Sequence, residues 1–383
     1  MNFRFAQLFL LAVLICTGCA TSPRSASVES TARELPLPRD RRGCLPFPGL
    51  FTLYARADVA RLGTHRYGDR TDAPAGNESE RGIFYTTKAG FLDLAHLRMT
   101  IDWTRFCVSK IRDAIDAGQT QVSMNGSNGS MFHATLQYPD DWSALPPAER
   151  ERLAFELALR TGERLAYLML LWHEVATWYG DHTFVFDESP SAFTWDDVMS
   201  HVIGVRVAEM ALRDRGRPFD EAVTLYLDAQ LQALGAVGPE KTQQAVDAVD
   251  GVWWAGGRPL KRQLDTGLDT NSVYPWLVPG LPFANGEKPQ PFAIPHVGTV
   301  IGRDLSDFCT VRIEPRIAAA QAMRRVLPDA RPAWFGTDDL SDILVAMRTQ
   351  MTEQFGLAVS EPWPARTPQG KLARGQTPGD AAP

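Results

Sequence analysis

Apolar residues recur at helical spacing through the middle of the chain and predict a set of packed helices. The strongest pattern runs from Pro147 to about Tyr179, and nearly its whole circumference is apolar between Leu165 and Trp172. A helix that is apolar on all sides is buried among other elements. We therefore expect this helix to cross the centre of the domain, with the other helices packed around it.

Further amphipathic patterns predict helices before and after this central one. They cover residues 91 to about 117, 191–211, 219–234, 240–249, 317–326 and 340–355. In the second of these, Thr194 is the expected N-cap. Asp197 follows three residues later, which makes an acidic variant of the capping box.

Strands are predicted on both sides of the helical region. The β-branched or alternating segments are residues 83–87, 121–124, 132–138, 297–301 and 308–313. The turn Asn125 to Gly129 predicts a hairpin, and a phosphate-binding loop is excluded because no lysine follows at P-loop spacing. We expect an α+β fold, a single domain with a buried central helix, a helical core and peripheral short strands and hairpins.

The N-terminus has the pattern of a targeting segment. Arg4 precedes the apolar run Phe5 to Ile15, and Thr17-Gly18-Cys19 follows. An apolar run too short to span a bilayer, followed by small residues and a cysteine, resembles a bacterial lipoprotein signal peptide. We predict a signal peptide over residues 1–18 and a lipid on Cys19. An ordinary secretory signal cleaved near Ala20 is the alternative.

Composition divides the remainder of the chain. Residues 19–42 are rich in Ser, Pro and Arg and predict a disordered tether, while residues 43–361 form a single globular domain and residues 362–383 a disordered tail. The residue after Cys19 is Ala20 and not Asp, so the resemblance to lipoproteins implies an outer-membrane anchor with the folded part facing the periplasm. A net charge of −6 without a basic cluster argues against a nucleic-acid partner.

The five cysteines have separate expected fates. Cys16 leaves with the signal peptide, where it stands in place of the usual Leu, and Cys19 takes the lipid. Cys44, Cys107 and Cys309 remain in an oxidising compartment. One disulfide is expected, with Cys44 and Cys309 as the favoured pair because both lie outside helical patterns. Three buried thiols are the alternative.

The central helix carries an ionisable pair, His173 and Glu174, in otherwise apolar surroundings. Buried polar groups need partners, so this pair marks a candidate site. Glu163 lies three turns earlier on the face of Glu174, which gives a possible acidic stripe. In the alternative, these acids belong to a structural network and are neutralised by Arg98, Arg164 or Arg206.

Two further pairs lie on the neighbouring predicted helices. Asp93 and His96 are three residues apart and Asp197 and His201 four apart, so each pair shares a helix face. If the three helices pack together, these residues converge with His173 and Glu174. Such a set of ligands suits a zinc or di-metal carboxylate site.

The sequence therefore gives each candidate residue an expected role. Glu174 acts as a general base on a water held by His96, His173 and a divalent metal such as zinc. The candidate catalytic residues are Glu174, His173 and His96; the candidate metal ligands are His96, His173, Asp197 and His201; the supporting residues are Asp93, Arg98 and Asp102.

Residues 173–204 resemble part of a thermolysin-like zinc protease. Such proteases carry His-Glu-x-x-His on one helix and a Glu ligand twenty-four residues after the first His. Here Asp197 stands twenty-four residues after His173, but Thr177 replaces the second His. A neutral hydroxyl is a poor zinc ligand, so the resemblance implies a degenerate site in which His201 or His96 would have to substitute.

Most of the mature chain resembles a family of bacterial lipoproteins catalogued as domain of unknown function 4056. The segments that carry the likeness are residues 90–98 with Asp102-Trp103, then 173–180, 193–204, 274–280 and 313–316. This resemblance implies no activity.

Two functions from different classes remain. The first is a lipid-anchored, hydrolase-like protein with the site above. The second is a non-catalytic envelope lipoprotein that binds a protein or glycan partner through the segments Trp253-Trp254 and Tyr274-Pro275-Trp276. The aromatic residues of these segments suit either sugar stacking or packing in the core, and core packing is the commoner case. Convergence of the ionisable residues favours the first, whereas neutralisation by arginines favours the second.

Overall fold

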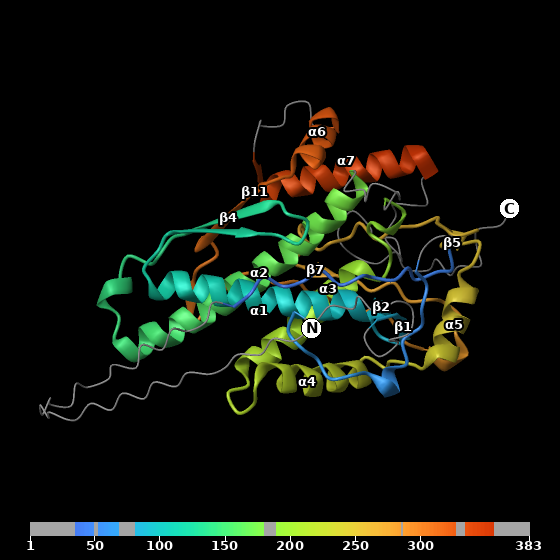
Figure 1. Ribbon diagram of the computed structural model, residues 1–383, viewed down its shortest axis with the longest axis horizontal. Helices are drawn as coiled ribbons and strands as arrows, with labels where there is room; N and C mark the ends of the chain where they lie inside the picture. Colours follow the sequence, from blue (N-terminus) through green and yellow to red (C-terminus); the bar gives the residue numbers. More distant parts are fainter. Residues whose placement is uncertain are drawn as a thin grey trace, which may run out of the picture. The chain divides into compact units, whose positions relative to one another are not determined.

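The computed structural model describes residues 35–49, 53–68, 81–179, 189–284, 286–326 and 334–355, which form an α+β arrangement (Figure 1). The predicted signal peptide, Cys19, most of the predicted tether and the predicted tail 362–383 lie outside these residues. Within the described residues, no helix has the length and apolar character needed to cross a bilayer.

The helices occupy the predicted segments to within a few residues, except at one start. They are α1 (Leu94–Asp116), α2 (Pro147–Trp178), α3 (Asp197–Arg213), α4 (Phe219–Ala233), α5 (Pro239–Ala248), α6 (Ile317–Val326) and α7 (Thr337–Phe355). Helix α3 begins at Asp197 and not near Ser191. Thr194 is not its N-cap, because Asp196 occupies that position. The N of Thr194 does donate to Oδ2 of Asp197 at 2.7 Å, which is the acidic half of the predicted capping box.

The strands form one four-stranded antiparallel sheet and several two-stranded pairs. The sheet has the order β12 (Phe335–Gly336), β11 (Cys309–Glu314), β4 (Met131–Leu136), β3 (Gln121–Asn125). The pairs are β1 (Ile83–Thr86) with β2 (Gly90–Asp93), β5 (Trp254–Ala255) with β6 (Arg258–Pro259), β7 (Ser272–Val273) with β8 (Phe292–Ala293), and β9 (Thr299–Val300) with β10 (Arg303–Asp304). The predicted hairpin across Asn125 to Gly129 is confirmed as β3 and β4.

Helices α1, α2 and α3 pack against one another at the centre (Figure 1). Two glycines allow the close approach: a Cβ on Gly162 of α2 would lie 2.5 Å from the backbone N of Val108, and one on Gly204 of α3 would lie 2.8 Å from the carbonyl O of Leu97. The stretch Leu165 to Trp172 is buried throughout, which confirms the predicted central helix. The three helices that carry the candidate residues are therefore in direct contact.

The segment 35–49 packs on α1. Arg41 donates to Asp102 at 3.0 Å, and the backbone N of Cys44 donates to Asp93 at 2.8 Å. The compact unit accordingly begins at Leu35, so residues 35–42, which the sequence assigned to the tether, belong to it.

A second hydrophobic cluster is aromatic and includes the tryptophans considered for glycan stacking. Trp253 and Trp276 are each 1% exposed, and Trp254 is also buried. Trp253 makes edge-to-face contacts with Trp195 and Trp276. Of the two interpretations of these side chains, the structure confirms packing in the core, because the rings pack against one another and are removed from solvent.

The predicted disulfide between Cys44 and Cys309 is also wrong. Cys44, Cys107 and Cys309 are free thiols, with the first two buried and the third half-buried. Cys44 lies beside Asp93 in the segment over α1, whereas Cys309 opens β11 opposite Leu136 of β4. The two cysteines belong to different parts of the fold, which the sequence pattern could not reveal.

Candidate metal centre

Asp93 joins three parts of the fold at the start of α1. Its Oδ1 accepts from the N of Ala95 at 3.0 Å, and its Oδ2 accepts from the N of Cys44 at 2.8 Å. Its own backbone N donates to the Oγ of Ser200 on α3 at 2.9 Å. This carboxylate is therefore both the N-cap of α1 and a fixed, fully buried acidic group.

His96 lies one turn later and faces two acids. Its Nδ1 is 3.4 Å from Oδ2 of Asp93 and 3.2 Å from Oδ1 of Asp197. Its side chain is 13% exposed, whereas those of the two aspartates are at most 1% exposed. His96 thus links an acid of its own helix to an acid of α3 at the point where the centre approaches solvent.

The residues before α3 hold two adjacent carboxylates. The hydroxyl of Thr194 lies 2.7 Å from Oδ1 of Asp196 and 3.1 Å from Oδ2 of Asp197, and the N of Thr194 donates to the same Oδ2 at 2.7 Å. These bonds leave Oδ1 of Asp197 facing His96. Among the described residues, Oδ2 of Asp196 has no hydrogen-bond partner.

Glu174 reaches the centre from α2 and is anchored by an unusual backbone conformation. Its Oε2 accepts from the N of Phe193 at 3.0 Å. Phe193 has a φ of 54°, in the left-handed region that costs energy for a residue with a Cβ. The strained peptide fixes one oxygen of the carboxylate and leaves Oε1 directed to His201.

The ring of His201 has an assignable tautomer. The single proton of the Thr100 hydroxyl goes to the carbonyl O of His96 at 2.7 Å, so at 3.1 Å from His201 Nδ1 this hydroxyl can only accept. Nδ1 of His201 therefore carries the proton and Nε2 carries a lone pair. That Nε2 has no hydrogen-bond partner in the described part of the chain and lies 3.7 Å from Oε1 of Glu174.

These side chains form two groups that share His96, and within each group the possible ligand atoms lie within 4.8 Å of one another. One group is Asp93, His96 and Asp196; the other is His96, Glu174 and Asp197. No lysine or arginine of the described residues forms an ion pair with any of the four carboxylates. Buried, closely spaced His, Asp and Glu ligands of this kind can hold a metal ion.

Burial shifts the protonation of the centre. It raises the pKa of Asp93 to about 6, although His96 and two backbone N–H groups oppose the rise. The pKa values of Asp196 and Asp197 are likewise raised, first by burial and then by neighbouring carboxylates. Burial lowers the pKa of His201 to about 3, and the charge of His96 acts in the same direction. His201 is therefore a neutral imidazole, the form that binds metals.

His96 responds in the opposite way. Burial acts to lower its pKa, but the hydrogen bond that its Nδ1 donates to Asp197 and the charges of Asp93, Asp197 and Glu174 outweigh burial and raise the pKa well above the usual value. Without a metal ion, the imidazolium of His96 is the cation that the surrounding acids hold.

Some of the predicted residues lie elsewhere. His173 belongs to neither group, and its Nδ1 lies 3.2 Å from the Oγ of Ser127 in the β3–β4 turn. Successive helical residues differ by about 100°, so Glu174 faces α1 and α3 while His173 faces the hairpin. Glu163 accepts from Arg160 on its own helix and forms no acidic stripe with Glu174.

The supporting residues Arg98 and Asp102 face a different network. Arg98 donates to the carbonyl O of Gly63 at 2.5 Å. Asp102 is buried between Arg41 and His65, with a contact of 3.0 Å to each. Through these contacts Arg98 holds the segment 53–68 to α1, and Asp102 holds both this segment and Arg41.

The expected neutralising arginines also have other partners. Arg164 donates to the carbonyl O of Pro295 at 3.2 Å, and the guanidinium of Arg206 stacks 4.8 Å from the ring of Phe292. The alternative in which these arginines neutralise the acids of the centre is therefore wrong.

Several functional groups were not found from the sequence. They are Asp196, the hydroxyl of Thr100, the backbone N of Phe193 and the glycine at position 43. Asp196 had a signal, because two adjacent acids stand at the start of a mostly apolar helix. The others act through tertiary contacts and left no pattern in the chain.

The sequence profile of a family described as "Protein of unknown function (DUF4056)" matches residues 40–264, more than half of the chain. The chain belongs to this family. All six ionisable residues of the centre fall within the matched range, and so do α1 to α5. No curated protein and no solved structure matches the chain.

Proposed function

We propose that this chain is a metal-dependent hydrolase in which His96, Glu174 and Asp197 bind a divalent ion such as zinc. The observation that carries the proposal is the unpartnered lone pair on Nε2 of His201, which lies 3.7 Å from a carboxylate oxygen of Glu174. Two electron-rich atoms at this distance repel each other unless a cation lies close to both. Nε2 of His201 thus adds a fourth possible ligand atom beside those of His96, Glu174 and Asp197.

The charge balance supports the same proposal. Four buried carboxylates meet two imidazoles, and burying unpaired charges is costly. A divalent ion supplies the missing positive charge. Protonation of His96 and of the aspartates is the other solution, and it corresponds to the alternative function of a non-catalytic envelope lipoprotein with a structural cluster.

The chemistry follows from the ligand set. Catalytic zinc sites combine three protein ligands with a water, and the ion lowers the pKa of that water to about 7. In this proposal Glu174 is a ligand and not the general base expected from the sequence. Asp93 and Asp196 form the second group around His96 and supply the proton acceptor, because burial raises the pKa values of both carboxyls, that of Asp93 to about 6.

The proposal includes the location indicated by the N-terminal sequence. The chain is anchored through a lipid on Cys19 in the outer membrane, and its folded part faces the periplasm. The support for this part is the pattern Thr17-Gly18-Cys19 after a short apolar run.

The test is the metal content of protein purified without chelator, followed by assays with ester, phosphodiester and peptide substrates. We expect bound metal in the wild type and an affinity lowered at least about 10–100-fold in His201→Gln. His65→Gln is the matched control, because His65 is also a buried histidine paired with an aspartate and should leave the metal in place. A folded wild type that takes up no added zinc, cobalt or manganese would refute the metal site. A metal-loaded protein inactive on all substrates would refute only the hydrolase.

A further inference from the structure

A pocket of about 540 Å³ lies apart from the metal centre, between α2, α3, α4 and the segment 293–299. None of its lining residues belongs to the metal centre. Its volume falls within the range of roughly 300–1,000 Å³ that is typical of small-molecule sites.

The pocket has an apolar wall and a charged end. Val202, Val205 and Ile294 are almost fully buried and form part of the wall, where Met210, Pro295 and Val297 join them. The charged end consists of Arg160 and Glu163 from α2 and Arg206 and Glu209 from α3. A ligand that fits both parts has an apolar body and one charged group.

Glu163 is the buried polar group of the charged end. It is 2% exposed, and its Oε2 accepts from Arg160 at 3.2 Å. Its Oε1 has no hydrogen-bond partner among the described residues. Burial, followed by the charge of Glu209, raises the pKa of Glu163 to about 8 although Arg160 opposes the rise. At neutral pH this side chain is therefore a carboxylic acid with a proton to donate.

Arg206 supplies a cation that forms no close ion pair among the described residues. Its guanidinium stacks on the ring of Phe292, and within the described residues it forms no ion pair. Arg160, in contrast, lies 3.2 Å from both Glu163 and Glu209. Arg160 thus pairs with the two acids of the charged end, and the guanidinium of Arg206 is left to pair with a negatively charged ligand.

We propose that this pocket binds a small organic acid, a compact apolar body that carries one carboxylate. The carboxylate accepts hydrogen bonds from Arg206 and from the acid of Glu163, and the apolar body lies against Val202, Val205 and Ile294. Charge-assisted hydrogen bonds of this kind are the stronger ones in proteins. The site is independent of the metal centre and of the hydrolase proposed above.

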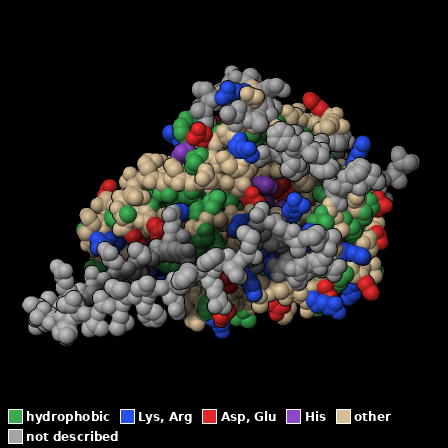
Figure 2. Space-filling view, in the orientation of Figure 1, with side chains coloured by type: hydrophobic (Ala, Val, Ile, Leu, Met, Phe, Trp, Pro, Cys, Tyr) green, Lys and Arg blue, Asp and Glu red, His purple; other side chains and the backbone are tan. Residues whose placement is uncertain are grey.

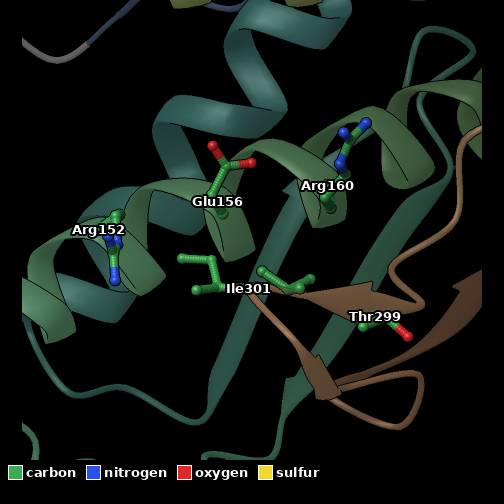
Figure 3. Close-up of a pocket in the computed structure, with 6 residues that line it drawn as sticks. Arg152, Glu156, Arg160, Thr299 and Ile301 are labelled. Atoms are coloured by element: carbon green, nitrogen blue, oxygen red, sulfur yellow. The ribbon is translucent and has the colours of Figure 1, made fainter.

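A shallower pocket of about 330 Å³ adjoins this one and shares Arg160 and Thr299 with it. Figure 3 shows its two sides, with Arg152, Glu156 and Arg160 on α2 and with Thr299 and Ile301 on the β9–β10 hairpin. Ile301 is 42% exposed, so a large apolar side chain lies at the edge of the combined space. A longer apolar body can extend in this direction.

The test compares hexanoate with hexanamide, a neutral molecule of nearly the same shape, by calorimetry at pH 6.5. We expect hexanoate to bind and hexanamide to bind at least about tenfold more weakly, since the amide has no charge to pair with the guanidinium of Arg206. Arg206→Met keeps a long side chain over Phe292 and removes the charge, so it should lose the preference for hexanoate. Arg152→Met is the control, because Arg152 lines only the adjoining pocket.

The pH dependence provides a second readout. Hexanoate binding should weaken as the pH rises through about 8, because ionised Glu163 then repels the carboxylate. Glu163→Gln should bind hexanoate with no such loss. The other charged or titratable groups around Glu163 are Arg160, Arg206, Glu209, Arg213 and His296. Equal binding of hexanoate and hexanamide, no binding of either, or full hexanoate binding by Arg206→Met would each overturn the proposal.

Discussion

Gly43 lies directly against the imidazole of His96. A Cβ added at Gly43 would be 2.7 Å from both Cε1 and Nε2 of that ring and 3.0 Å from Oδ2 of Asp93. The backbone of the N-terminal segment thus covers the metal centre so closely that no side chain fits between them. The position of His96 depends on a residue fifty-three positions earlier in the chain.

The first prediction concerns this contact. Gly43→Ala should displace the ring of His96 or lift the segment that covers it, and metal affinity should fall by at least about tenfold. Gly238→Ala is the matched control, because a Cβ there meets no atom within 4 Å. Competition with a chromogenic chelator measures both variants. Equal affinity in Gly43→Ala and wild type would show that His96 does not bind the ion.

A second prediction separates stability from metal binding at Glu174. Glu174→Gln keeps an oxygen that accepts from the N of Phe193, and it removes one charge from a buried acidic group. Its free energy of unfolding without metal should stay within about 1 kcal/mol of the wild type. Leu170→Ala, at a fully buried position of the same helix, should lose about 2–5 kcal/mol.

Urea midpoints in chelator measure both variants, and metal uptake measures the loss of function. If Glu174→Gln unfolds more readily than Leu170→Ala, Glu174 is the hub of a structural charge network, and its role as a metal ligand loses support.

The third prediction is a dependence of stability on pH. Burial raises the pKa of Asp93 to about 6, above the value of about 3.9 in an unfolded chain. The folded state therefore binds the proton more tightly, and the resulting stability is fully present below about pH 4 and lost as the pH rises through 6. The raised pKa of His96 acts in the same direction at higher pH. The lowered pKa of His201 opposes them below about pH 6.5, where the imidazole is protonated only in the unfolded chain, but it is one group against Asp93, Asp196, Asp197 and His96.

Chelated protein should accordingly be more stable at pH 5 than at pH 8. Added metal should reduce or reverse this difference, because metal binding displaces protons and strengthens with pH. Urea midpoints with chelator and with zinc at both pH values provide the measurement. Asp93→Asn should flatten the profile of the chelated protein, and an unchanged profile would argue against titration of this carboxyl.

The fourth prediction concerns the lipid. Cys19→Ser should move the protein from the membrane pellet to the periplasmic fraction, because the acyl chains at this residue provide the stable attachment. Cys309→Ser is the control, since Cys309 is a free thiol of the folded part. Immunoblots of the separated fractions measure the change. A Cys19→Ser protein that still pellets with outer membranes would refute lipidation.

Surface charge shows why composition could not locate a site. In Figure 2, acidic, basic and apolar side chains are mixed over the visible face outside the grey residues. The residues that matter for the two proposals are buried or half-buried. Local patterns, and not overall charge, therefore carried the useful sequence information.

The sequence by itself determined the helices, the β3–β4 hairpin and the family. Periodic apolar residues fix a helix locally, and the stretch Leu165 to Trp172 could only be a buried one. The sequence also placed Asp197 with His201, because residues four apart share a helix face whatever the helix packs against. It placed Asp93 near His96 as well, but the contact arises because Asp93 is the N-cap of α1 and His96 lies in the first turn.

Only the tertiary structure decided which of these faces meet. The close approach at Gly162 and Gly204 brings three helices together, and their relative rotation directs Glu174 inward and His173 toward the hairpin. The same packing buries the tryptophans and separates Cys44 from Cys309. The lone pair of His201 next to Glu174 depends on hydrogen bonds among residues that are distant in sequence, and such contacts leave no periodic pattern in a single chain.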